Sequence, residues 1–457
     1  MTVLFLALIL ITTGCFCFLS NPFLNVAGTD SSIFLYVARL FNEGNVFYRD
    51  VFDQKGPLIF IINAIGLRIC ENSFMGIWLL DCIAYLGALF LSFRLSSRFV
   101  ERKYALVTMA PLAAIYHLVA CGGNMPEMYI IVFSLLAYDI CISGKKWAVL
   151  DCLMMGACVG LILMLKLNMI VVVIPIGICW ICKREKVKNF FFIAMGCLMA
   201  VLPFIIYLWA NNALMSFWEI YIEYNSQYAR PYRLLPEINR GCMIVAVTAV
   251  LNGMLCRNRS LNESMRSALL LNFIYLMATW GLIVVSGGTN RYYGPILPAC
   301  VLPIASFLHL CKKYFSRIVF IVSEILLVLI MFQRNLCYGN QSQKESLDRL
   351  RPLIKDKESV TVLGCDCFVY MYLNVKSPTR FPYQGTIAHT SNYYRNKILE
   401  DINNQKSKYL IVPDDVLNTD GSLGVSWAKS MVFERYEMLL KRGHYSLYKR
   451  RVKSDSE

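Results

Sequence analysis

The segment FMGIWLLDCIAYLGALFLSF, residues 74–93, contains one charged residue, Asp81. About 20 predominantly apolar residues are enough for an α-helix to cross the hydrocarbon core of a bilayer. The segment therefore predicts a transmembrane helix. The composition of the whole chain agrees, because 57% of its 457 residues are hydrophobic and only 16% are charged. In soluble domains about a quarter of the residues are charged.

Comparable apolar segments occur along the first three quarters of the chain, although some are short. With residues 74–93 they predict a polytopic α-helical membrane protein with about eleven transmembrane helices. The first segment lacks the basic start of a secretory signal peptide, so we expect it to be retained as the first helix. The other segments are 2–20, 104–120, 128–143, 147–165, 168–182, 189–210, 240–256, 267–286, 293–310 and 317–333.

Lysine and arginine are concentrated in every second loop between these segments, whereas the opposite loops carry acids and aromatic residues. Because basic loops stay in the cytoplasm, this alternation predicts a multi-pass protein of the cell membrane with a cytoplasmic N-terminus and an external C-terminus. It also accounts for the formal net charge of +15, so we expect no nucleic-acid partner. The basic loops are 94–103, 145–146, 183–188, 257–266 and 312–317, and the opposite loops are 21–73, 121–127, 166–167, 211–239 and 287–292.

The external loops also contain three apolar patterns that do not predict crossings. The first repeats at helical spacing and predicts an amphipathic helix lying in the membrane interface. The second, residues 58–70, follows Gly56-Pro57 and predicts another interfacial or re-entrant helix. The third is aromatic and predicts anchors at headgroup depth. The first pattern comprises Ile33, Tyr36, Val37, Leu40 and Phe41, and the third comprises Phe217, Trp218, Tyr221, Tyr224 and Tyr228.

The composition becomes polar and charged after residue 334. We therefore expect a transmembrane catalytic domain over residues 1–334 and a small extracytoplasmic α/β domain over residues 335–457. Short runs of β-formers between turn residues predict its strands, and helical periodicity predicts its helices. The expected strands are 361–364, 379–383, 409–413 and 444–448, and the expected helices are near 343–355, 391–404 and 426–441.

The first external loop holds a concentration of polar residues that a plain connection would not need. Gly28-Thr29-Asp30-Ser31-Ser32 and Asp50-Val51-Phe52-Asp53-Gln54-Lys55-Gly56-Pro57-Leu58 place acids and a lysine directly after the first apolar segment. Charge at this position suggests chemistry on a lipid-borne substrate at the membrane surface. Asp30 could act as a general base, and Lys55 could hold a phosphate beside the close backbone approach that Gly56 allows.

Later external loops supply further candidates. Arg291, within Gly287-Gly288-Thr289-Asn290-Arg291-Tyr292-Tyr293-Gly294, offers a second phosphate contact, and Tyr293 beside it is a candidate for substrate binding. Asp53 and Glu127 could bind the acceptor or a divalent cation. No cysteine spacing supports a zinc site, so no cofactor is certain. Lys166 and Asn168, in a tight external turn, are weaker candidates.

Each candidate also has a purely structural explanation. Asp30 could be a first-turn acid and Glu127 an acid at a helix N-terminus, since both positions suit the helix dipole. Lys55 could extend to the lipid headgroups. Arg291 could bind anionic headgroups without specificity. The structural explanation of Asp30 leaves Asp53 and Lys55 unexplained, which favours a functional role for the cluster.

Three of these motifs together resemble a known superfamily. Asp30 in the first external loop, Phe52-Asp53-Gln54-Lys55-Gly56-Pro57-Leu58, and Gly122-Gly123-Asn124-Met125-Pro126-Glu127 resemble the C-type (GT-C) membrane glycosyltransferases. The similar branch contains the bacterial protein-mannosyltransferase-like and aminoarabinose-transferase-like enzymes. The resemblance extends to the layout of the whole membrane domain, with interfacial helices after the first span and a soluble domain at the external C-terminus.

The resemblance implies a glycosyltransferase of cell-envelope polysaccharide biosynthesis. Its donor would be a polyprenyl-phosphate-linked sugar, and its acceptor a glycan or a lipid-linked molecule among the membrane lipids. By the same resemblance Asp30 matches the catalytic acid, Lys55 the lysine that contacts the lipid-linked phosphate, and Glu127 an acid of the second external loop. Gln54 departs from relatives that carry an acid or a histidine there, sometimes as a metal ligand.

Two other functions remain open at this point. A polysaccharide ligase or polymerase would use arginines in a large external loop, and residues 211–239 with the helix after them contain Arg230, Arg233 and Arg240. A lipid-linked glycan transporter would carry charges inside its spans, near the midplane. The spans hold few charges, and those that occur are Asp81, Asp139, Asp151 and Glu324.

Overall fold

The computed structural model describes most of the chain outside the first apolar segment. The expected first helix at 2–20 lies outside the described residues, as do most of 168–182 and much of 317–333. The described residues are 28–71, 73–119, 123–142, 148–172, 177, 186–228, 240–285, 290–311, 315–323, 325–326, 329, 341–355, 358–364, 366–405, 407–414, 416–420 and 424–451.

The chain forms two compact units, which we call the helical unit and the sheet unit. The helical unit comprises Met1–Asn25, Lys55–Tyr207 and Ala229–Cys337. The sheet unit comprises Val26–Gln54, Leu208–Tyr228 and Tyr338–Glu457. The C-terminal segment thus forms one compact unit with two segments from the first three quarters of the chain. The functional division into domains at residue 334 stays a prediction.

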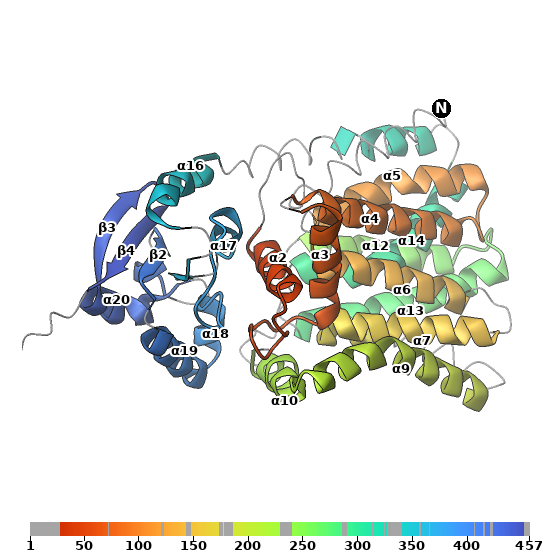
Figure 1. Ribbon diagram of the computed structural model, residues 1–457. Coiled ribbons are helices and arrows are strands. Elements are labelled where there is room, and N and C mark those ends of the chain that lie inside the picture. The colour runs from red at the N-terminus through yellow and green to blue at the C-terminus, as the bar shows by residue number, and fades with distance from the viewer. Residues whose placement is uncertain are drawn as a thin grey trace, which may run out of the picture. The chain divides into compact units, whose positions relative to one another are not determined.

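The helical unit is a bundle in which α4, α6 and α7 run side by side and α3 lies crosswise at one of their ends (Figure 1). Most of its helices coincide with the predicted apolar segments, because a long apolar run buries its backbone polar groups only as a helix. The described helices of this unit are α3 Pro57–Ile69, α4 Met75–Ser96, α5 Arg102–Val119, α6 Pro126–Ile142, α7 Val149–Leu165, α9 Lys186–Ala210, α12 Arg240–Cys256, α13 Glu263–Val285 and α14 Leu297–Leu310, with 3-10 segments η1 Leu167–Val172 and η3 Asn290–Ile296. The last residues of α9 belong to the sheet unit.

Three described helical stretches are long and apolar enough to cross a membrane by length and composition. They are α4 Met75–Ser96, α9 Lys186–Ala210, and Tyr293–Leu310, which combines the end of η3 with α14. They indicate a membrane location for the chain. The expected total of about eleven crossings and their orientation stay predictions. The shorter segment at residues 58–70 forms α3, which begins at Pro57 as the Gly56-Pro57 pair predicts.

Glycines allow α7 and α9 to pack closely. A Cβ added at Gly156 would lie 1.9 Å from the carbonyl oxygen of Ile193, and one added at Gly196 would lie 2.2 Å from that of Leu153. Any side chain at either position would therefore push the two backbones apart. Small residues at helix crossings are typical of membrane bundles, where lipid offers no hydrophobic force to bring helices together.

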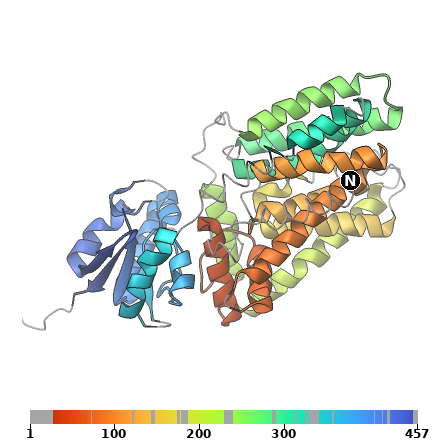
Figure 2. The ribbon, with the colours of Figure 1, turned by 90° about the horizontal axis from the view of Figure 1, so that it is seen from above.

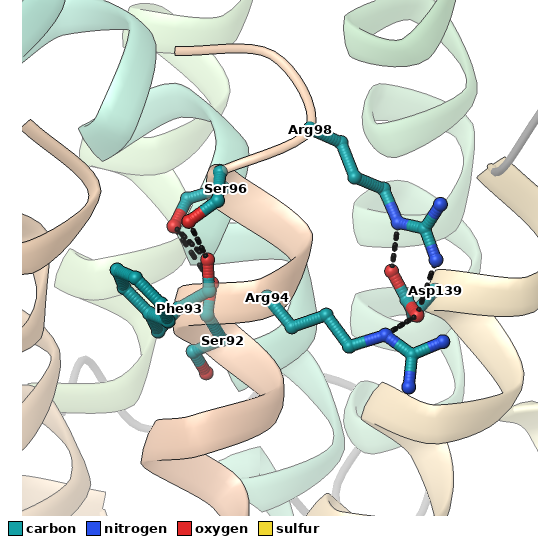
Figure 3. A network of polar contacts seen from close by, with 7 residues as sticks. Ser92, Phe93, Arg94, Ser96, Arg98 and Asp139 are labelled. Atoms are coloured by element: carbon teal, nitrogen blue, oxygen red, sulfur yellow. Dashed lines mark hydrogen bonds and ion pairs between the residues drawn. The ribbon is translucent and has the colours of Figure 1, made fainter. Parts of the chain in front are cut away.

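Asp139 explains one of the charges inside a predicted span. Its side chain is fully buried on α6, and Figure 3 shows it between two arginines at the end of α4. Arg98 donates to both carboxylate oxygens, at 2.6 and 2.9 Å, and Arg94 lies 3.0 Å away. Such a buried carboxylate tolerates its desolvation only because these partners neutralise it. Asp139 therefore ties α4 to α6.

The sheet unit contains a four-stranded mixed sheet in the order β1-β2-β4-β3, with α16 beside β4 (Figure 2). β1 and β2 are parallel, and the other two pairings are antiparallel. The strands are β1 Val360–Val362, β2 Tyr409–Pro413, β3 Tyr436–Arg442 and β4 Tyr445–Arg450. The helices are α2 Thr29–Asn42, α10 Leu214–Phe217, α11 Asn225–Tyr228, α16 Gln341–Leu350, α17 Phe368–Tyr372, α18 Gly385–Thr390, α19 Asn392–Gln405 and α20 Lys429–Arg435, with the π-helical turn η2 Trp218–Tyr224 and the 3-10 segments η4 Arg351–Leu353, η5 Val416–Asn418 and η6 Ser426–Ala428.

Two predictions for the C-terminal segment were wrong. The helix expected over 426–441 ends at Arg435, and the chain continues as β3, which forms a hairpin with β4 through Gly443 at a φ of +58°. The strand expected over 379–383 does not form. Pro378 and Pro382 each lack the N–H that a sheet ladder needs. The Thr379 hydroxyl organises the segment instead, because it donates to the carbonyl oxygen of Phe381 and accepts from the N–H of Phe381.

The apolar face of α2, which was predicted to lie in the membrane interface, packs on other residues of the sheet unit. Tyr36 stacks on Tyr370 of α17 with 4.6 Å between ring centroids, and its hydroxyl accepts a hydrogen bond from the N–H of Ser377. Burial raises the pKa of the Tyr36 hydroxyl above its ordinary range. Arg39 donates to the carbonyl oxygen of Tyr370 at 2.9 Å. An amphipathic stripe suits lipid and protein equally, and here it packs on protein.

Candidate active site

Glu127 and Lys166 form a buried ion pair at one end of the helical unit. Glu127 is the second residue of α6, after Pro126, and Lys166 directly follows α7. Lys166 Nζ donates to Glu127 Oε1 at 2.6 Å, and the side chains are only 13% and 6% exposed. The two external loops that sequence analysis predicted on the same side of the membrane therefore meet in the structure.

The backbone of Gly56 lies directly against the end of α7. Its N–H donates to the carbonyl oxygen of Leu165 at 3.1 Å. A Cβ on Gly56 would lie 2.0 Å from the carbonyl oxygen of Met164, so only glycine allows this approach. Lys55 directly precedes Gly56 and Lys166 directly follows Leu165, and the backbones of Gly56 and Leu165 are in contact. This contact brings the Lys55 motif to the Glu127–Lys166 pair.

The segment η3, which carries Arg291 and Tyr293, reaches the same place. A Cβ on Gly294 would lie 3.3 Å from the Cβ of Glu127. The side chain of Arg291 lies outside the described residues, although its backbone is within η3. We use the name charged end for Lys55, Glu127, Lys166 and η3 together, since all four meet at this end of the helical unit.

Tyr293 is fully buried in the helical unit. A Cβ on Gly241 of α12 would lie 2.3 Å from its ring, and its hydroxyl is 2.8 Å from the Sγ of Cys242. The ring therefore fills the space that the missing side chain of Gly241 leaves. This packing against α12 accounts for the tyrosine, and its role in binding a substrate stays a prediction.

Asp30 and Asp53 belong to the sheet unit. Asp30 is half-buried in the first turn of α2, where an acid suits the helix dipole. Asp53 is 2% exposed. The backbone around it is held from two directions, because the N–H of Phe52 donates to Arg380 O at 2.7 Å and Asn225 Nδ2 donates to Gln54 O at 2.8 Å.

The charge of Asp53 also affects a neighbouring phenol. The pKa of Tyr48 lies well above its ordinary value, first because the ring is buried, and further because Tyr221 and the carboxylate of Asp53 lie nearby. A buried tyrosine with a raised pKa stays neutral. The convergence of Asp30, Asp53, Lys55 and Glu127 in one cavity stays a prediction, since the two acids and the other two residues belong to different units.

The predicted cation has no preassembled site in the described part of the chain. Among the described residues, no group of three or more His, Cys, Asp and Glu could hold a metal ion. Asp53 and Glu127, the proposed ligands, belong to different units. A divalent cation therefore stays a prediction, and the mechanism below uses none.

A network of buried hydrogen bonds that was not predicted from the sequence holds the start of α6. From the sequence, Asp81 was noted only as a charge inside a predicted span. In the structure its carboxylate accepts hydrogen bonds from Asn124 and Tyr129, one on each side of Glu127 in the sequence. A lone acid in an apolar helix was the available signal. Asn168, the other residue of the tight turn, is exposed.

No family model and no curated protein matches the sequence. Solved structures do match. The crystal structure of ArnT from Cupriavidus metallidurans bound to undecaprenyl phosphate has a TM-score of 0.69 and 13% identity, covering 98% of this chain and 97% of ArnT. The apo form of ArnT has a TM-score of 0.65.

The chain has the GT-C fold. A second similar structure with this fold is the archaeal oligosaccharyltransferase AglB from Archaeoglobus fulgidus, in complex with an inhibitory peptide and a dolichol-phosphate. It has a TM-score of 0.54 and 11% identity over 99% of this chain and 75% of AglB. An oligosaccharyltransferase from the same organism, in complex with Zn and sulfate, has a TM-score of 0.52, 9% identity, and coverage of 97% of this chain and 73% of the other. The GT-C resemblance predicted from the sequence is confirmed for the fold.

Proposed function

We propose that this GT-C chain is a membrane glycosyltransferase. It transfers a sugar from a polyprenyl-phosphate-linked donor to a cell-envelope glycan or a lipid-linked acceptor on the external face of the cell membrane. The observation that carries the proposal is the charged end, where a lysine motif, a buried ion pair and η3 meet on a fold shared with ArnT bound to undecaprenyl phosphate.

In the proposed reaction the acceptor hydroxyl attacks the anomeric carbon of the donor. Asp30 takes the proton of that hydroxyl as general base. The bond between the anomeric carbon and the phosphate oxygen breaks, and the polyprenyl phosphate leaves with the electron pair. Inversion of the anomeric centre follows from attack opposite the leaving group.

The leaving phosphate gains negative charge as the bond breaks, so catalysis requires fixed positive groups beside it. We assign this role to Lys55 and Arg291. Lys166 carries the same charge, but Glu127 neutralises it within the ion pair. The pair therefore serves to hold the ends of α6 and α7 beside Lys55. Asp53 orients the acceptor in this proposal.

The charges inside the helices favour an enzyme over a transporter. A transporter uses such charges along a substrate path near the midplane. Asp139 is instead saturated by Arg94 and Arg98, and Asp81 holds a turn. A ligase or polymerase would depend on Arg230 and Arg233, which lie outside the described residues, and on Arg240, whose side chain is likewise not described.

The test is transfer from radiolabelled polyprenyl-phosphate sugars in membranes that contain Asp30→Asn protein. We expect at least a 100-fold loss of transfer, within the usual range for removing a general base. Asp50→Asn is the matched control, because Asp50 lies in the same loop and pairs with Arg49 at the surface. Full transfer by a folded Asp30→Asn protein contradicts the assignment of the base. Absence of transfer by the wild type with every sugar donor contradicts the function.

A further inference from the structure

Asp81 is fully buried in α4, a helix that is otherwise apolar over most of its length. Its carboxylate accepts hydrogen bonds from two residues at the start of α6 and just before it. Oδ2 accepts the N–H of Asn124 at 2.7 Å, and Oδ1 accepts the hydroxyl of Tyr129 at 2.8 Å. Asn124 precedes Glu127 by three residues and Tyr129 follows it by two. The carboxylate therefore holds the chain on both sides of Glu127.

Asn124 is itself held in an unusual conformation. Its φ is +48°, in the left-handed region that few residues other than glycine adopt. Its side chain forms two reciprocal hydrogen bonds with Asn63 of α3, at 2.7 and 2.8 Å. Both asparagines are fully buried. The turn before α6 is thus fixed by α4 through Asp81 and by α3 through Asn63.

The same asparagine pair reaches the other half of the charged end. α3 begins at Pro57, directly after Lys55 and Gly56, and Asn63 lies one to two turns along this helix. Hydrogen bonds in an apolar interior are strong and define one arrangement. The starts of α3 and α6, which carry Lys55 and Glu127, are therefore fixed to one another by groups buried beneath them.

We propose that Asp81 is a positioning residue of the active site. Acting through Asn124 and Tyr129, it sets the position of Glu127 against Lys166 and keeps the start of α6 aligned with Lys55. The catalytic consequence rests on the proposed glycosyl transfer. A buried acid in a membrane helix is costly, and well-packed apolar residues would stabilise a helix contact at least as well. The geometry around Glu127 explains why an acid is used.

The experiment measures the position of Glu127 without any enzyme assay. Lys166 is shielded and ion-paired, so acetic anhydride should modify it slowly in purified wild-type protein in detergent micelles. We expect Asp81→Asn and Tyr129→Phe to raise its modification rate several-fold, measured by mass spectrometry of the Lys166 peptide. Lys103, which is 62% exposed, reports the reagent dose and should not change.

Asp139→Asn is the matched control. Asp139 is equally buried and also ties α4 to α6, but it does so through Arg94 and Arg98 rather than at Glu127. It should lower the melting temperature and leave Lys166 modification as in the wild type. In transfer assays Asp81→Asn should lower kcat by about 100-fold, as a small misplacement of a catalytic group does, with a much smaller change in donor KM.

Two results would overturn the proposal. One is unchanged Lys166 modification in folded Asp81→Asn and Tyr129→Phe proteins. The other is an equal rise in Asp139→Asn, because a general loosening of the bundle would then be the cause. If Lys166 modification rises as expected and the wild type transfers no sugar from any donor, the positioning role stands and the proposed function fails.

Discussion

Lys166 Nζ donates to Glu127 Oε1 at 2.6 Å, across 39 positions of the sequence. This ion pair links the first turn of α6 to the residue that ends α7. Because both side chains are nearly buried, removing Lys166 would leave the Glu127 carboxylate without this partner in a poorly solvated place. The pair is therefore a fixed element of the charged end.

The first prediction concerns this pair. Lys166→Met leaves Glu127 buried without its partner, and we expect a loss of about 3–5 kcal/mol in the free energy of unfolding. Transfer should fall as well. The double variant Glu127→Gln with Lys166→Met removes both charges and should recover most of the stability. Thermal unfolding in detergent measures both. Equal stability of the single and double variants would show that the two side chains do not interact.

The second prediction concerns Gly56. Gly56→Ala would place a methyl group 2.0 Å from the carbonyl oxygen of Met164, so Lys55 must move away from the end of α7. We expect a loss of stability and a strong loss of transfer. Gly253→Ala in α12 is the control, since no atom lies within 4 Å of its added Cβ. It should be neutral or stabilise by roughly 0.5–1 kcal/mol. Melting temperatures and transfer rates are measured for both variants. A fully active Gly56→Ala protein would contradict the close approach of Gly56 to the end of α7.

Apolar length predicted the helices of the helical unit well. The segments at 74–93, 189–210 and 240–256 appear as α4, α9 and α12 with small changes at the ends. In a bilayer, hydrophobic length is the dominant constraint, and one sequence contains it in full. The face of α2 was predicted less well, because the same apolar stripe can cover lipid or, as here, α17.

The sequence predicted on which side of the membrane the candidate site residues lie, but not which of them are in contact. Loop alternation placed Glu127 and Lys166 on the same side, yet their ion pair depends on how α6 packs on α7. The role of Asp81 was missed for a similar reason. Its partners Asn124 and Tyr129 lie more than 40 positions away, and Asn124 must adopt a positive φ to reach it. Strand β3 was missed because Glu437 to Lys441 lacks a clear alternation of apolar and polar residues.

The third prediction concerns Lys55 and the donor phosphate. Lys55→Ala should raise the KM for the polyprenyl-phosphate sugar about 10- to 100-fold, since a hydrogen bond to a charged group contributes roughly 1.5–3 kcal/mol. Lys55→Arg keeps the charge and should retain more activity than alanine. Lys103→Ala, at the surface, is the control. Initial rates over a range of donor concentrations give these values. An unchanged KM in Lys55→Ala would contradict the assignment of Lys55 to the phosphate site.

The fourth prediction concerns pH and the sheet unit. The pKa of Asp366 lies above its ordinary value of 3.8, chiefly because the carboxyl is buried, and hydrogen bonds from Tyr445, the Phe368 N–H and Gln343 partly offset this. A raised pKa in the folded state means that protonation favours folding. The contribution of Asp366 to stability is thus fully present below its ordinary pKa and is lost as pH rises through the raised value.

Asp366→Asn is neutral at every pH, so relative to the wild type its stability should improve as pH rises from about 3.5 towards 7, above the ordinary pKa of a carboxyl. Tyr445→Phe removes a donor that lowers the pKa of Asp366. It should therefore widen the pH range over which stability is lost and cost about 1–3 kcal/mol near neutral pH. Tyr393→Phe, at an exposed position of α19, should do neither. These differences in stability are measured by unfolding the full chain in urea, with proteolytic cleavage within residues 338–457 as the readout of unfolding. Parallel pH profiles for wild type and Asp366→Asn would show that Asp366 titrates no differently in the folded and unfolded chain.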